Sequence, residues 1–322
     1  MFEKVLEAVK QHDTVIIHRH ARPDGDALGS QLGLAALIRE NFPEKTVYTV
    51  GDGAGRYSFM TGSDMDIVPD EAFNGALSVI LDSAVPGLVS DTRYKLAHAT
   101  ARIDHHIYCE TFTDIEVVDT SFESAAGMIA ELARESGLRL SLNSATPIYT
   151  GMVTDSGRFR YDSTSPRTLR LAGWLLEQGI DTEALYRELY SEDLASVKRK
   201  AVFLAKIRRY DDSPVAYMIH TAEEIRELGM DTFSVSRGTV NMMSDIRGID
   251  IWVNFTEEDD HFLCELRASN YNINPIAVKY GGGGHQKASG ASVPDLKTAF
   301  MMLEDLKKLT ETTGENTPCS SR

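Results

Sequence analysis

Cysteine is scarce in this sequence, and the few cysteines offer no disulfide framework. Cys109, Cys264 and Cys319 are an odd set without paired spacing, which argues against a zinc knuckle and favours a reducing cytoplasm. Long apolar runs are absent too, so we expect no membrane span. The start, MFEKVLEAVKQH, lacks the basic region and apolar core of an export signal and is typical of an amphipathic helix. We therefore expect a cytoplasmic protein.

Positive charge is also in short supply. Lysine and arginine number 33 against 48 aspartates and glutamates, which gives a formal net charge of −15. Because affinity for long nucleic acid comes mainly from neutralising many phosphates, this charge argues against a long duplex as partner. A short single-stranded RNA or a small phosphorylated nucleotide remains compatible, provided that a local basic pocket and divalent cations meet its phosphates.

What is present is enough for two domains. The chain has 322 residues, of which 42% are hydrophobic and 25% are charged, and this length exceeds a usual single core. We expect a first domain over 1–190, a helical linker over 191–210 and a smaller second domain over 211–315. The remaining residues, 316–322, read as a disordered polar tail.

The first domain alternates strands with helices. Apolar, β-branched runs predict strands at 14–17, 46–50, 77–82 and 101–104, and helical spacing predicts helices at 26–44, at 121–137 and from about 144 onward. This alternation predicts an α/β fold with a doubly wound, mainly parallel sheet and helices on both faces. In such a sheet, ligands bind at the carboxyl ends of the strands.

Acidic residues and histidines gather at that edge. They lie in HRHARPDGDALGS after the first strand, at the ends of the strands VILD and ARID, and in TGMVTDSGRF. The candidate site residues are His20, Asp24, Asp26, Asp82, His105, His106 and Asp155. Carboxylates and imidazoles without a thiolate suit Mn²⁺ or Mg²⁺ better than structural zinc. A bridging carboxylate would support two ions about 3.5–4 Å apart.

These residues also have simpler interpretations. Asp24 and Asp26 beside a glycine are common turn residues, Asp82 is compatible with a helix N-cap, and Asp155 precedes a helix-ending turn. The adjacent histidines are compatible with a hydrogen-bonded surface pair. The metal interpretation is favoured because several separate segments would otherwise bring such residues to one edge by coincidence.

The second domain is predicted to be a smaller α/β domain with a mixed sheet. A helix around 191–209 leads into the strands PVAYMIH, IDIWVNF and HFLCELRAS, with helices around 223–228, 236–246 and 295–309. The stripe of leucines on the last helix is typical of core packing.

The run GGGGH is the feature of this domain that bears on chemistry. Four glycines usually indicate a flexible linker, but these lie between a helix, NPIAVKY, and a strand, KASGASV. That context favours close approach of the backbone to a ligand, with several amides forming a nest for an anion. For the nearby Lys287, ordinary surface charge is the simpler interpretation. The candidate substrate-binding residues are Arg267, Ser269, Gly282, Gly283, Gly284, His285 and Lys287.

These motifs carry a resemblance. HARPDGDALGS, VILDSA, IDHH and TGMVTDSGRF, in this order and followed by GGGGH, resemble the motifs of the DHH phosphoesterase family and its C-terminal domain, and the form of the first motif is most similar to the bacterial nanoRNase branch. The resemblance implies one metal ion on His20, Asp24 and Asp82, and a second on Asp26, Asp82, His105 and Asp155. It also implies that Asp104 orients a histidine ring, while His106 faces the substrate phosphate or the leaving group.

The implied activity is metal-dependent hydrolysis of phosphoesters. The branch degrades short oligoribonucleotides, and we expect attack from an end, mononucleotide products and a second activity on 3′-phosphoadenosine 5′-phosphate, with two divalent cations, Mn²⁺ or Mg²⁺, as cofactors. Three alternatives stay open: a phosphodiesterase of cyclic or linear dinucleotides, a pyrophosphatase, and a nucleotide-binding module without turnover. A homodimer is also left open.

Overall fold

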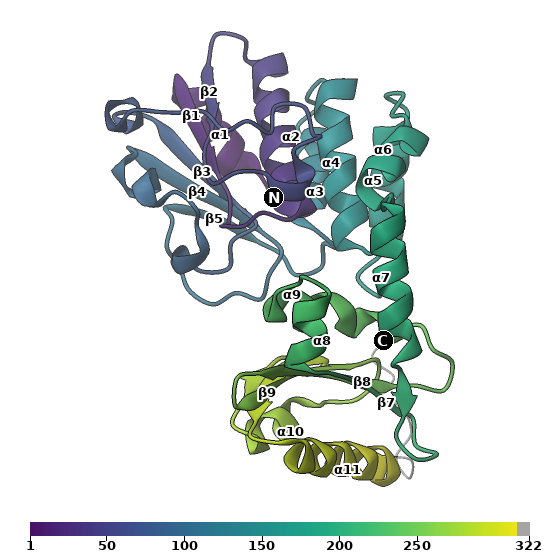
Figure 1. Ribbon diagram of the computed structural model, residues 1–322. Coiled ribbons are helices and arrows are strands. Elements are labelled where there is room, and N and C mark those ends of the chain that lie inside the picture. The colour runs from purple at the N-terminus through teal and green to yellow at the C-terminus, as the bar shows by residue number, and fades with distance from the viewer. Residues whose placement is uncertain (314–322) are drawn as a thin grey trace. The chain divides into compact units, whose positions relative to one another are not determined.

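The computed structural model describes residues 1–313 and divides into two compact units, Met1–Ser191 and a second that begins at Glu192 (Figure 1). The predicted polar tail, 316–322, lies outside the described residues. Within the described part of the chain, no helix combines the length and the apolar character needed to cross a membrane.

The first unit contains a five-stranded sheet among its described residues, with the order β2-β1-β3-β4-β5. Its strands are β1 (Thr14–His18), β2 (Thr46–Thr49), β3 (Leu77–Leu81), β4 (Ala99–Asp104) and β5 (Ile115–Val118). Neighbouring strands are parallel throughout, which confirms the predicted parallel sheet. The order reverses between β1 and β3, so their carboxyl ends flank the switch point at which such sheets bind ligands.

The two faces of this sheet are covered differently. Its helices are α1 (Glu3–Gln11), α2 (Gly25–Asn41), α3 (Ala125–Glu135), α4 (Leu142–Asp155), α5 (Pro166–Leu176) and α6 (Thr182–Tyr190). Helices α2, α3 and α4 pack with Ile17 and Val79 in the main core. On the other face, Ile16 and Ile80 pack under the segments 50–76 and 83–97, where short 3-10 helices stand in place of α-helices. Repeated glycines and prolines in these segments break longer helices.

Helices α2 and α4 approach each other closely through glycine. A Cβ added at Gly29 would lie 2.5 Å from the carbonyl oxygen of Pro147, and one added at Gly25 would lie 2.4 Å from Oγ1 of Thr154. The spacing of four residues places both glycines on one face of α2. This contact brings the first turn of α2 beside the last turn of α4.

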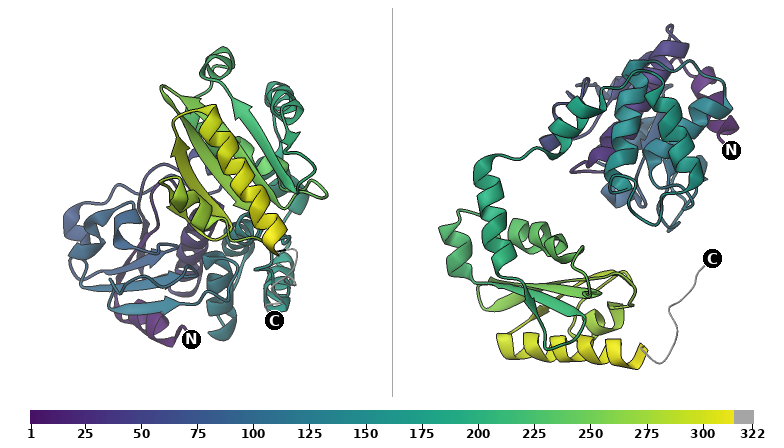
Figure 2. Two further views of the ribbon diagram at one scale, coloured as in Figure 1. Left: turned by 90° about the horizontal axis from the view of Figure 1, so that it is seen from below. Right: turned by 90° about the vertical axis from the view of Figure 1, so that its right-hand side faces the viewer.

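The second unit contains a mixed sheet with the order β10-β11-β9-β8-β7-β6. Its elements are α7 (Leu194–Ala205), β6 (Arg208–Arg209), β7 (Val215–His220), α8 (Ala222–Glu227), α9 (Thr232–Val240), β8 (Ile251–Glu258), β9 (His261–Ala268), α10 (Asn274–Lys279), β10 (Gly283–Gly284), β11 (Ala288–Val293) and α11 (Leu296–Thr313). Only β7 and β8 pair in parallel among the described strands of this sheet. Helices α8 and α9 lie on one face, and α10 and α11 lie on the other (Figures 1 and 2).

One helix of this unit differs in position from its prediction. Helix α9 spans Thr232–Val240, whereas 236–246 was predicted. The side chain of Asp231 accepts a hydrogen bond from the backbone N–H of Ser234 and thereby sets the start of the helix.

Candidate metal centre

The loop after β1 places three potential ligands at the start of α2. Asp24 is the N-cap of this helix, and its Oδ1 accepts hydrogen bonds of 3.0 Å from the backbone N–H groups of Asp26 and Ala27. His20 donates through Nδ1 to the carbonyl of Ala21 at 2.9 Å. This hydrogen bond leaves Nε2 of His20 as the nitrogen available to a metal ion.

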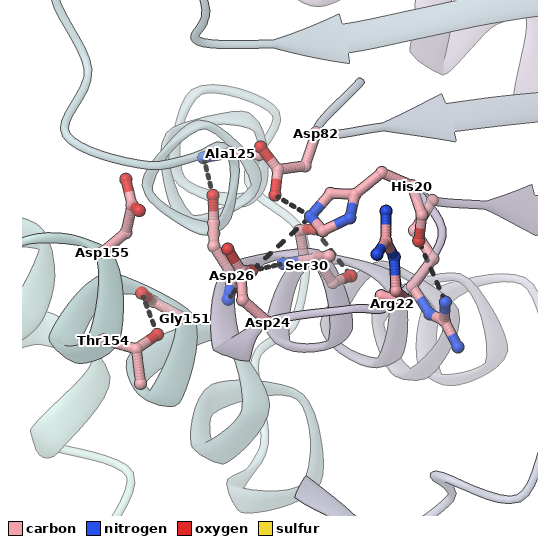
Figure 3. A network of polar contacts seen from close by, with 12 residues as sticks. His20, Arg22, Asp24, Asp26, Ser30, Asp82, Ala125, Gly151, Thr154 and Asp155 are labelled. Atoms are coloured by element: carbon pink, nitrogen blue, oxygen red, sulfur yellow. Dashed lines mark hydrogen bonds and ion pairs between the residues drawn. The ribbon is translucent and has the colours of Figure 1, made fainter. Parts of the chain in front are cut away.

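Asp26 is buried against the start of another helix. Its two carboxylate oxygens accept hydrogen bonds from the backbone N–H groups of Ala125 at 2.7 Å and Ala126 at 2.8 Å, at the N-terminus of α3 (Figure 3). The helix end favours a negative charge at this position. Asp26 is therefore held in one orientation.

Asp82 occupies the centre of the site. It follows β3 directly, with a left-handed φ of 51°, and no described helix begins there, so the N-cap interpretation of Asp82 is wrong. Its Oδ2 lies 3.4 Å from Nε2 of His20, and its Oδ1 lies 3.5 Å from Nε2 of His105. Among the described residues, Oδ1 is buried without a hydrogen-bond donor. A buried anionic oxygen of this kind fits a cation.

The remaining donors flank Asp82 on two sides. On one side, Nε2 of His20 lies 3.8 Å from Oδ1 of Asp24. On the other, Nε2 of His105 lies 3.7 Å from Oδ2 of Asp26 and 3.5 Å from Oδ2 of Asp155. Figure 3 shows Asp155 at the end of α4, across from the loop that carries His20. Donor atoms of each side lie within 4.8 Å of one another.

The electrostatics of this cluster call for positive charge. Burial opposes protonation of His20, but the nearby carboxylates of Asp24 and Asp82 raise its pKa to about 11. Burial and the neighbouring carboxylates raise the pKa of Asp26 well above its ordinary value, and burial raises that of Asp155 to about 6. Oxygen and imidazole donors so crowded fit divalent cations, which would take the place of these protons.

The second histidine of the pair is held differently from the first. Nδ1 of His106 donates to Oδ1 of Asp104 at 2.8 Å, and Asp104 is buried. This hydrogen bond raises the pKa of His106, although partial burial acts in the opposite direction. The side chain of His106 is 47% exposed, so its ring borders the metal centre with one edge open to solvent.

Two buried arginines that the sequence did not single out hold the loops of the site. Arg19 pairs with Oδ1 of Asp52 at 2.7 Å, and Asp52 also accepts from the backbone N–H of Arg22 at 2.6 Å. Arg102 donates to the carbonyl of Ala84 at 3.0 Å and pairs with Glu116 at 2.6 Å. Buried arginines need such partners, but residues so far apart in the chain give no local signal in the sequence.

The candidate substrate residues of the second unit are brought together around β9 and β11. Ala288, beside Lys287, pairs in register with Arg267, and the backbone N–H of Ser269 donates to Asp250. Nη1 of Arg267 pairs with Oε2 of Glu265 at 3.1 Å. The substrate-binding roles of these residues stay predictions.

The predicted nest of glycine amides needs a correction. The backbone N–H groups of Gly282 and His285 donate to the carbonyls of Ala277 and Ala288, at 2.9 and 2.7 Å, so they do not point at a ligand. Gly283 and Gly284 form β10 and pair with β11. A Cβ at Gly282 would lie 1.9 Å from the carbonyl oxygen of Gly290, so close packing of two backbones already accounts for this glycine.

Comparison with known proteins agrees with this arrangement. Residues 14–152 match the DHH family, N-terminal domain, and residues 228–314 match the DHHA1 domain. The bifunctional oligoribonuclease and PAP phosphatase NrnA of Bacillus subtilis is 35% identical, with 96% of this chain and 98% of that protein covered. The chain belongs to the DHH family.

Two further relatives of this DHH protein cover nearly its whole length. A probable bifunctional oligoribonuclease and PAP phosphatase NrnA of Streptococcus mutans is 34% identical over 96% of this chain and 98% of that protein. The crystal structure of an exopolyphosphatase-related protein from Bacteroides fragilis superposes with a TM-score of 0.83 at 25% identity, and covers 96% of this chain and 97% of that one.

Proposed function

We propose that this protein is a metal-dependent phosphoesterase. Its substrates are short oligoribonucleotides, hydrolysed from one end to mononucleotides, and 3′-phosphoadenosine 5′-phosphate, from which it removes the 3′-phosphate. The observation that carries this proposal is the buried Asp82 carboxylate, which faces His20 through one oxygen and His105 through the other, 3.4 and 3.5 Å away. The names of the near-full-length relatives support the substrate class.

The two oxygens of Asp82 suggest how two cations would share one carboxylate. His20 and Asp24 would hold one ion with Asp82, and Asp26, His105 and Asp155 would hold the other. Mn²⁺ is our first choice and Mg²⁺ the second, because the donors are carboxylates and imidazoles. Such a pair of ions supplies a nucleophile from water at neutral pH and neutralises charge on phosphoryl oxygens.

His106 is the residue that we assign to the leaving group. Its Nδ1 is engaged by Asp104 at 2.8 Å, which leaves Nε2 to face the substrate. The hydrogen bond to Asp104 raises the pKa of His106 and so favours the protonated ring. A protonated imidazole can contact the phosphate or donate a proton to the departing oxygen.

The second unit would bind the end of the substrate that does not react. Arg267, Ser269, His285 and Lys287 would meet its terminal phosphate and sugar. We place the enzyme in the cytoplasm, because Cys109 and Cys264 are free thiols and suit a reducing compartment. Sedimentation analysis would decide whether it forms the homodimer that the sequence leaves open.

The test is a comparison of substrates. Labelled RNAs of two to five nucleotides, 3′-phosphoadenosine 5′-phosphate and a cyclic dinucleotide would be assayed in parallel, each with Mn²⁺, with Mg²⁺ and with a chelator. We expect metal-dependent release of mononucleotides and of phosphate. Turnover of the cyclic dinucleotide or its linear product alone would assign the protein to the alternative phosphodiesterase activity, and tight binding without turnover would contradict enzymatic function altogether.

A further inference from the structure

On one face of the sheet in the second unit, helices α8 and α9 pack over β8 and β9. Cross-strand partners share a face of a sheet, and the residues at one level of this face are Asn254 on β8, Glu265 on β9 and Gly290 on β11. Asn254 is fully buried, and its amide donates to backbone carbonyls of α9. Gly290 carries no side chain. The face therefore passes from a part covered by α9 to a floor of small residues along β11.

Helix α9 presents a basic and an aromatic side chain beside this floor. Phe233 and Arg237 are four residues apart and so lie on one side of the helix. The guanidinium carbon of Arg237 lies 4.8 Å from the centroid of the Phe233 ring. Phe233 is 55% exposed, which is unusual for a phenylalanine that has a core available to it. Its exposure leaves ring surface open for stacking.

The carboxylate of Glu265 on β9 contacts both Arg237 of this helix and Arg267, the predicted phosphate ligand on the same strand. Nε of Arg237 lies 3.2 Å from Oε1 of Glu265, and Nη1 of Arg267 lies 3.1 Å from Oε2 of the same residue. Two guanidinium groups thus share one negative charge, which leaves the trio with a net positive charge. No described residue accepts a hydrogen bond from the Nη atoms of Arg237, whose side chain is 62% exposed. That planar pair of donors matches a phosphate.

We propose that Phe233 and Arg237 extend the substrate site into a nucleotide subsite on this face. Arg237 and Arg267 bind a phosphate from its two sides, and the base of the same nucleotide stacks on the open surface of Phe233. The small side chains of β11 leave room for the sugar between them. Because stacking accepts every base, this subsite grips a nucleotide without selecting its sequence. The inference rests on the proposed function, since it supplies a subsite for the RNA substrate.

The experiment measures equilibrium binding to the full-length protein by calorimetry, in chelator so that nothing turns over. The probes are AMP and ribose 5-phosphate, which share the phosphate and the sugar and differ in the base. We expect Arg237→Ala to weaken both probes by about tenfold, and Phe233→Ala to weaken AMP by about fivefold or more while ribose 5-phosphate changes little. Phe233→Trp restores AMP binding. Arg226→Ala, which removes an exposed arginine on the neighbouring helix α8, serves as the matched control.

Several outcomes would overturn the subsite. Equal loss of both probes in Phe233→Ala would mean that Phe233 only supports the fold, and unchanged affinities in Arg237→Ala would remove the phosphate contact. An equally large loss of affinity in the Arg226→Ala control would show that the effect comes from the overall positive charge and not from a specific contact of Arg237. A wild-type enzyme that hydrolyses neither short RNA nor 3′-phosphoadenosine 5′-phosphate would instead contradict the proposed function, whatever the probes show.

Discussion

Asp82 combines two unfavourable features that its position explains. It is a non-glycine residue in the left-handed region, with a φ of 51°, a conformation that costs about 1–3 kcal/mol. Its Oδ1 is also buried without a donor among the described residues. Both features are explained if the sharp turn after β3 places one carboxylate between two groups of metal ligands. A shared ligand then has a distinctive mutational signature.

We expect Asp82→Asn to abolish binding of both cations, because the amide keeps the shape but removes the shared charge. Turnover should fall by at least about 100-fold, beyond the usual loss for a residue that only supports a ligand. Asp155→Asn should weaken one ion and leave the other bound. Metal content by mass spectrometry and Mn²⁺ titration would measure this, with the exposed Asp64→Asn as control. Retention of one tightly bound ion in Asp82→Asn would refute the shared carboxylate.

His220 provides a second residue whose environment has a measurable consequence. Burial, together with the nearby Lys206 ammonium, lowers the pKa of His220 to about 4. In the unfolded chain the ring titrates near its ordinary pKa, so between the two values the unfolded state binds more protons than the folded state. Stability of the second unit should therefore decline as the pH falls from about 6.5 towards 4.

The expected contribution of His220 is about 2 kcal/mol less stability at pH 5 than at pH 7. His220→Phe should lack this part of the pH dependence, because the ring cannot be protonated. Urea unfolding followed by the fluorescence of the buried Trp252, in a Trp174→Phe background, reports on the second unit alone. An equally steep loss of stability in the variant would show that other groups carry the pH dependence.

At the scale of elements, the contact between α2 and α4 determines whether Asp26 and Asp155 can meet. Gly29→Ala forces a methyl group against the backbone of Pro147, 2.5 Å away, and backbone cannot move aside as a flexible side chain can. We expect a loss of about 1–3 kcal/mol or more in stability and weaker metal binding. Circular dichroism during urea unfolding measures the first effect.

The matched control is Gly173→Ala in α5. A Cβ at this position meets no atom within 4 Å, and the residue is exposed. Alanine in place of an exposed helical glycine should stabilise by about 0.5–1 kcal/mol. If both substitutions had the same effect, helix propensity rather than the close approach of α2 and α4 would govern Gly29.

How far the sequence predicts these elements depends on how strongly each one is patterned. Strands β1 and β3 are buried apolar runs and were predicted within one residue, because a strand covered on both faces needs no polar alternation. Strand β5 was not predicted, since IEVV mixes an acid into a run of only four residues. Helix α9 was misplaced because its apolar positions are few and its start depends on Asp231.

The residues of the metal centre were predictable for a different reason. Each potential ligand stands next to a strongly predicted strand or helix, and parallel strands bring their carboxyl ends to a common edge. The residues that orient them were not predictable. Arg102 meets Glu116 across neighbouring strands, and Asp26 meets Ala125 across 99 residues, contacts that appear only once the chain is folded. The glycines of GGGGH were misjudged because packing and anion binding favour the same residue.

At the scale of the whole molecule, the two units divide the chemistry between them. Every residue that offers a donor to the metal centre lies between His20 and Asp155, within the first unit. The arginines of the proposed nucleotide subsite belong to the second. The two tryptophans of the chain are divided in the same way, because Trp174 packs against the core of the first unit and Trp252 lies in the second. Each unit therefore carries its own reporter.

This division leads us to expect that metal ions stabilise one unit and not the other. A ligand that binds only the folded state adds about 2.7 kcal/mol at a concentration one hundred times its dissociation constant. Saturating Mn²⁺ should therefore shift the unfolding of the first unit to higher urea, followed through Trp174 in a Trp252→Phe variant. The second unit, followed through Trp252, should unfold at an unchanged midpoint. Equal shifts of both would show that the units unfold as one cooperative body, and a shift of neither would contradict the metal centre itself.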